Sequence, residues 1–156
     1  MPVDLALEGT AQRETTLGRA LAAKGRLLLA TAGMKRRELS LVLTDDAHIA
    51  ALNAQWRGET KATDVLSFPM DEPEAERPRQ GPLGDIVISL ETTAIEAAKV
   101  GFTRDDMAVF LLVHGFCHLL GHDHGEPAEA ALMRADEDRF LAAIAGPAAV
   151  RPPTPY

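Results

Sequence analysis

Residues 113–124 constrain this chain more than any other segment, because they include four of its five histidines. They overlap the end of a stretch, 107–120, that is apolar on nearly every side, which predicts a buried helix. His114 and His118 are four residues apart, so their side chains stack on one face of that helix. Two buried imidazoles need polar partners, since an unpaired buried polar group costs about 1–3 kcal/mol. A zinc ion at about 2.1 Å from both nitrogens would satisfy them.

The third ligand has to come from beyond the helix. A histidine eight residues after His114 would lie about 12 Å further along a continuous helix axis. Gly121 is suited to end the helix, because glycine accepts the left-handed conformation of a C-terminal stop. The chain can then fold back to bring His124 to the metal, and His122 is the alternative, nearer the turn and more strained as a ligand. We expect one Zn²⁺ ion held by His114, His118 and His124.

Three neutral histidines leave zinc with an open fourth position, which is typical of catalytic sites. A water there becomes a nucleophile near neutral pH, so hydrolysis is the favoured reaction class. The alternative is that these are ordinary helix and loop histidines. The spacing is close to the zinc-protease signature H-E-x-x-H-x-x-G-x-x-H, but Gly115 replaces its catalytic glutamate. Because that glutamate activates the water, its absence argues against a protease.

The motif H-G-x-x-H-L-x-G-x-D-H, at 114–124, resembles the signature of the YbeY family. These are bacterial rRNA maturation factors described as single-strand-specific, metal-dependent endoribonucleases. Segments 52–58, 63–69 (Thr-Asp-Val-Leu-Ser-Phe-Pro) and 83–89 (Leu-Gly-Asp-Ile-Val-Ile-Ser) are similar as well. The resemblance covers most of the chain from about residue 41 to 140. It implies single-stranded ribosomal RNA as the substrate and the small ribosomal subunit as a partner.

Arg57 is the candidate for binding the substrate's phosphate, because a guanidinium forms two hydrogen bonds to phosphate and stays charged. The family resemblance assigns the matching arginine to the active site. At the end of a helix, Arg57 could instead bind the last carbonyls. Asp123 either orients a histidine ligand or shapes the turn beside it. Asp85, at the start of a strand, is a further candidate neighbour of the site.

The net charge of −7 argues against a nucleic-acid-binding protein, since such domains usually have a basic surface. Binding of RNA then requires local positive charge. Segment 35–37 (Lys-Arg-Arg) is one source, and Arg57 with Lys61 is the other. The first source could also be a plain solvated loop. A non-catalytic ribosome-assembly factor with a structural metal fits the acidity better and stays open as an alternative, ahead of a metalloprotease.

The composition indicates one globular domain, with 156 residues and 46% hydrophobic content. Cys117 is the single cysteine, so an internal disulfide is excluded and a reducing cytosol is favoured. We expect Cys117 in the core. The sequence shows no secretory leader and no apolar run near the roughly 20 residues of a membrane span. We therefore expect a soluble, cytoplasmic protein.

Hydrophobic periodicity predicts the order strand, helix, strand, helix, strand, strand and three helices. This order indicates one α+β domain, residues 1–146, with a four-stranded mixed sheet covered by helices and a zincin-like metal helix. A single helix is expected over 10–32. Loop 71–82 is rich in proline and charge and is expected to be mobile, either as a substrate lid or as a simple crossover. The proline-rich tail, 147–156, is expected to be disordered.

The helical stripes also predict which side chains face inward. Among them are Leu27, Trp56, Ile95 and Leu132, each at helical spacing from other apolar residues. His48 lies in a charged first turn and is expected at the surface.

Overall fold

The computed structural model describes residues 2–72 and 75–153. The elements follow the predicted order: β1 (Val3–Leu7), η1 (Gly9–Arg13), α1 (Thr15–Thr31), β2 (Arg37–Thr44), α2 (Asp46–Arg57), β3 (Val65–Pro69), β4 (Gly81–Ser89), α3 (Leu90–Lys99), α4 (Arg104–Leu119) and α5 (Pro127–Ala145). The helix expected over 10–32 is divided, because Glu14 has the non-helical angles φ −88° and ψ 47°. Glu14 instead forms a two-pronged ion pair with Arg104 at the start of α4.

The sheet has the strand order β1-β2-β4-β3. β1 and β2 are parallel, as are β2 and β4, whereas β3 runs antiparallel to β4. The predicted four-stranded mixed sheet in an α+β domain is therefore confirmed. β3 is an edge strand, so one side of its backbone is not covered by another strand of the sheet.

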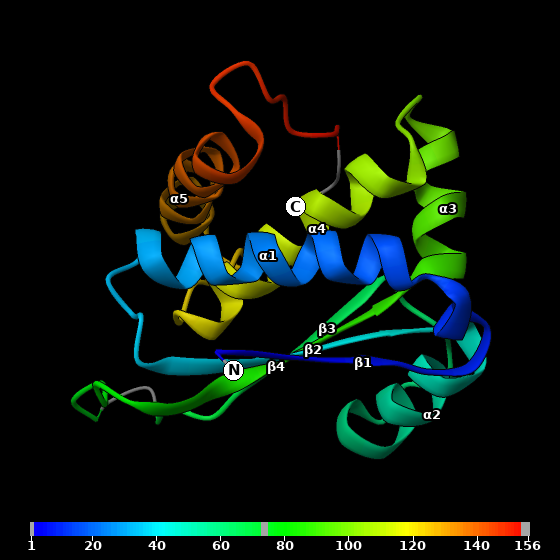
Figure 1. Cartoon of the computed structure of the whole chain (residues 1–156), viewed down its shortest axis with the longest axis horizontal. Coiled ribbons are helices and arrows are strands. Elements are labelled where there is room, and N and C mark those ends of the chain that lie inside the picture. The colour runs from blue at the N-terminus through cyan, green and yellow to red at the C-terminus, as the bar shows by residue number, and fades with distance from the viewer. Residues whose placement is uncertain (1, 73–74, 154–156) are drawn as a thin grey trace.

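Four helices, α1, α3, α4 and α5, lie on one face of this sheet, and α2 lies on the other (Figure 1). The main core fills the space between the sheet and the four helices. α4 lies at its centre and is buried on almost every side, including Phe110, Phe116 and Cys117. A smaller cluster of Ile49, Leu66 and Val87 lies beneath α2. No helix in the described ranges is long and apolar enough to cross a membrane.

α4 approaches the sheet closely because it has a glycine at the contact. A Cβ added at Gly115 would lie 3.0 Å from Cγ2 of Ile86 and 3.0 Å from Oγ of Ser67. Ser67 also donates a hydrogen bond of 3.3 Å to the Gly115 carbonyl. The helix that carries His114 and His118 is thereby held directly against β3 and β4.

The prediction that a side chain faces the core is wrong at four positions. Leu27, Trp56, Ile95 and Leu132 are all exposed. Each lies at the border of a helical stripe, and each helix here buries a narrower face than its apolar pattern suggests. In α2, for example, the buried residues are Ile49 and Asn53, both of which precede its last turn. Cys117 is buried and His48 is half-exposed, as expected.

Arg37 is buried, so it does not belong to a basic surface patch. Its side chain is 1% exposed and pairs with Asp71 through bonds of 3.1 and 2.7 Å. It also donates to the carbonyls of Pro78, Gly81 and Pro82. The arginine thus anchors the loop between β3 and β4, and only Lys35 and Arg36 of the expected basic segment are exposed.

The loop between β3 and β4 is also tied to the end of α4. Arg77 donates a hydrogen bond of 2.9 Å to the carbonyl of Leu120 and one of 3.3 Å to the carboxylate of Asp71. These contacts hold the described part of the loop near the turn that follows α4. Residues 73–74 of the predicted mobile loop lie outside the described residues.

Residues 147–153, which we expected to be disordered, pack against the helices. Ala149 contacts the main core, Pro152 is buried, and Arg151 forms an ion pair with Glu137 on α5. Residues 154–156 of the predicted tail lie outside the described part of the chain.

Replacing Arg37 with alanine should lower the free energy of unfolding by about 3–5 kcal/mol, because it leaves the Asp71 carboxylate without its buried partner. Arg36→Ala, an exposed neighbour, should change it by less than about 0.5 kcal/mol. Denaturant titration followed by circular dichroism measures both values. Equal stabilities for the two variants would contradict the buried role of Arg37.

Candidate metal centre

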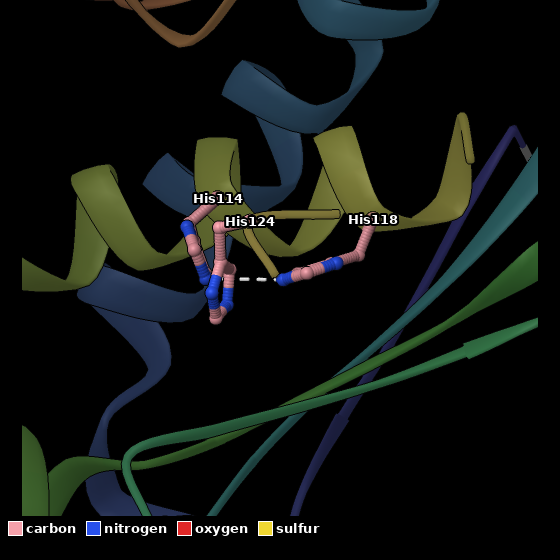
Figure 2. A group of neighbouring side chains, drawn as sticks. All are labelled: His114, His118 and His124. Carbon is pink, nitrogen blue, oxygen red and sulfur yellow. Dashed lines mark hydrogen bonds between the residues drawn. The ribbon is translucent and has the colours of Figure 1, made fainter. Parts of the chain in front are cut away.

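The three predicted ligands come together in the structure. One ring nitrogen from each of His114, His118 and His124 lies within 4.8 Å of the others. His114 and His118 project from the sheet side of α4, and His124 returns from the following loop (Figure 2). Gly121, with φ 96°, makes the turn that the sequence predicts after the helix.

Hydrogen bonds at the outer nitrogens fix the direction of two of these rings. Nδ1 of His114 lies 2.6 Å from Oε2 of Glu137, and Nδ1 of His118 lies 2.9 Å from the carbonyl oxygen of His122. A carboxylate and a carbonyl can only accept, so both Nδ1 atoms are donors. In the neutral rings, both Nε2 atoms therefore present lone pairs to the site.

The spacing between those two Nε2 atoms fits a shared metal ion. They lie 3.2 Å apart. Two ligands of a tetrahedral zinc ion, each at 2.0–2.1 Å, are separated by about 3.4 Å. Two lone pairs this close repel each other unless a cation lies between them. The geometry is thus that of a group of residues that could hold one metal ion.

The protonation states support metal binding at neutral pH. Burial, followed by the neighbouring His114, lowers the pKa of His118 to about 4. Burial would raise the pKa of Glu137, but hydrogen bonds from His114 and Arg151 outweigh it, and the net shift is downward. His118 is therefore neutral and Glu137 ionised at pH 7, and a neutral imidazole is the form that could bind a metal.

Glu137 is a buried partner of a candidate ligand that the sequence analysis missed. It lies on α5, is only 2% exposed, and shares the inner face of the helix with Met133, Phe140 and Ile144. An acidic residue within an apolar helical stripe was the available signal, because a buried carboxylate requires a specific partner.

His122, the alternative ligand, lies outside the three-histidine group. Its Nε2 lies 2.7 Å from Oδ2 of Asp136 on α5, so the ring is held away from the other three. Its backbone carbonyl instead orients His118. Asp123 accepts a hydrogen bond of 2.7 Å from the backbone N–H of His124, which is the turn-shaping role. Asp85 lines a separate cavity near α2.

A cleft of about 530 Å³ opens over the histidines. Arg57 also lines this cleft. Its Nη2 donates a hydrogen bond of 2.9 Å to the carbonyl oxygen of Ser67 on β3, and its guanidinium carbon lies 5.8 Å from the centre of the Phe68 ring. Gly58, at φ 69°, ends α2 by donating to the Asn53 carbonyl. The Arg57 side chain is thus directed to the cleft and β3.

Comparison with known proteins identifies the family. The family model described as Endoribonuclease YbeY matches residues 10–145. The chain belongs to the YbeY family. The endoribonuclease YbeY of Rhizobium johnstonii is 50% identical over 107 residues, which are 69% of this chain and 63% of that protein. That of Rhodopseudomonas palustris is 43% identical over 143 residues, which are 88% of this chain and 72% of the relative.

A solved structure supports the fold of this YbeY-family chain. The solution structure of a Thermotoga maritima protein matches with a TM-score of 0.66 and 23% sequence identity. The match covers 92% of this chain and 89% of the other. At this identity, the likeness establishes the fold alone.

Glu137→Gln should weaken the binding of Zn²⁺ or Co²⁺ by tenfold or more, since loss of a ligand's outer partner typically costs 10–100-fold. The amide keeps the shape of the carboxylate but accepts a weaker hydrogen bond from His114. Glu129→Gln, on the exposed face of α5, is the matched control and should bind like the unaltered protein. Competition with a chromophoric chelator measures the affinities, and equal values for both variants would contradict the assignment.

Proposed function

We propose that this protein is an endoribonuclease that cleaves single-stranded RNA with one zinc ion held by His114, His118 and His124. We further propose that it acts in the cytoplasm during maturation of ribosomal RNA on the small subunit. The convergence of the three imidazoles beneath a cleft lined by Arg57 is the observation that supports hydrolysis of a phosphodiester. Zinc, when bound there, would supply a water that is nucleophilic near neutral pH.

The residues of the chain have separate tasks in this proposal. The three histidines hold the metal, and Glu137 orients the ring of His114 by accepting a hydrogen bond from its Nδ1. Arg57 is held over the cleft by the Ser67 carbonyl, which uses one of the five N–H donors of a guanidinium. Its remaining donors suit a phosphate oxygen whose negative charge grows in the transition state.

The acidic net charge is compatible with RNA cleavage if the positive charge is local. Arg57 and Lys61 line the cleft, together with the acids Glu59, Asp64 and Asp123. Such a mixed surface favours weak non-specific binding, because few phosphates are neutralised. We therefore expect recognition of the strand to depend on contacts near the metal rather than on a broad basic surface.

Two features disfavour the protease alternative. Gly115 packs against Ile86 and Ser67, so the Cβ of a glutamate there would lie 3.0 Å from both side chains and would require them to shift. The edge of β3 is also partly occupied, because Arg57 binds the Ser67 carbonyl, Asp64 binds the Val65 N–H, and Pro69 has no N–H. A peptide substrate cannot readily add to such an edge as a further strand.

Cleavage assays separate the nuclease from an assembly factor with a structural metal. Purified protein is given single-stranded RNA, or denatured protein, with and without a chelator. We expect RNA cleavage that stops on chelation and returns with Zn²⁺, and no proteolysis. His114→Ala excludes a contaminating ribonuclease. Chelation that unfolds the protein, with no RNA cleavage beforehand, would support the assembly factor instead.

Arg57→Ala should reduce RNA cleavage by about 10²-fold, since it removes a preorganised charge aimed at the reacting phosphate. Metal content and thermal stability should stay unchanged. Arg79→Ala, an exposed arginine outside the cleft, should cleave normally. Cleavage of a fluorescent RNA oligonucleotide measures the rates, and full activity in Arg57→Ala would remove this residue from the mechanism.

A further inference from the structure

The segment that follows α5 is linked to the candidate metal centre through the side chain of Arg151. Arg151 lies within residues 147–153, and its Nη2 donates a hydrogen bond of 2.7 Å to Oε1 of Glu137. It also contacts Asp138 and the carbonyl of Arg134, so the guanidinium lies against α5. The side chain is 19% exposed, which places most of it inside the protein.

Glu137 links this arginine to a metal ligand. Oε1 accepts from Arg151 at 2.7 Å, and Oε2 accepts from Nδ1 of His114 at 2.6 Å. The two oxygens therefore have different partners, and the carboxylate has little freedom to rotate without losing one of them. Arg151, Glu137 and His114 form a continuous line of charge-assisted hydrogen bonds that ends at the metal site.

The partner Glu137 explains why a charged residue stands at position 151. Glu137 is 2% exposed, and a charged partner such as Arg151 offsets the cost of burying its carboxylate. Arg151 also carries a cost, because its Nη1 is buried without a hydrogen-bond partner. An apolar side chain would anchor the segment over Phe110 without that cost. The interaction with Glu137 is what distinguishes arginine from such a residue.

We propose that Arg151 is a positioning residue of the metal centre, which holds Glu137 in the orientation that fixes the ring of His114. Residues 147–153 thus contribute to the affinity for the metal as well as to the packing of the helices. This inference rests on metal binding by the three histidines, and it does not depend on RNA being the substrate.

The competing explanation is that Arg151 only fastens the segment to the fold. Arg104 provides the matched control, because it joins the start of α4 to Glu14 through bonds of 2.8 and 3.0 Å. Loss of either arginine removes ion pairing between two elements. Only the pair at Arg151 leads to a metal ligand.

The experiment compares the full chain with Arg151→Met, Arg151→Lys and Arg104→Met. Binding of Zn²⁺ and Co²⁺ is measured by chelator competition, and the visible absorption of the Co²⁺ form reports the ligand geometry. Circular dichroism first establishes that each metal-free variant is folded. If Arg151→Met does not fold, Arg151→Gln replaces it, since glutamine keeps much of the polar stem and removes the charge.

We expect Arg151→Met to bind both metals about tenfold more weakly, with an altered Co²⁺ spectrum. Arg151→Lys should recover part of the affinity, because it restores a cation near Glu137. Arg104→Met should bind as tightly as the unaltered protein, even where it is less stable. Normal affinity and spectrum in Arg151→Met would overturn this inference alone, whereas failure of the unaltered protein to bind either metal would overturn the metal centre as well.

Discussion

The hydrogen bond between His114 and Glu137 determines how the centre of this molecule is built. A carboxylate buried among apolar side chains is tolerated only because imidazole and guanidinium groups satisfy its two oxygens. In return, it sets the tautomer of His114 and turns Nε2 toward the cleft. α5 therefore has a chemical role besides closing the core, since Asp136 beside Glu137 also holds His122, whose carbonyl orients His118.

The close contact between α4 and the sheet depends on Gly115. It brings the histidines beside the edge strand β3, where Ser67 binds both α4 and Arg57. One strand thus connects the metal ligands with the candidate phosphate-binding arginine. The same glycine that permits this contact removes the general base of a zinc protease. Gly115 therefore accounts both for the close packing of α4 on the sheet and for the absence of the protease glutamate.

The sequence predicted the element order, the mixed sheet and the grouping of His114, His118 and His124, because helical spacing and a glycine stop are local properties. It did not predict Glu137 or the burial of Arg37, since both depend on partners distant in the chain: His114 and Arg151 for one, Asp71 for the other. Trp56 was misplaced because periodicity shows which side chains are apolar but not how wide a face the neighbouring layer covers.

Metal content is the most direct test of the central claim, that three imidazoles hold one ion in a hydrolytic site. The protein is purified without added metal, exposed to Zn²⁺, dialysed, and analysed for its elements beside His118→Ala. The account predicts about one zinc per chain in the unaltered protein and a marked loss in the variant. A variant that retains a full equivalent, or an unaltered protein that retains none, would contradict it.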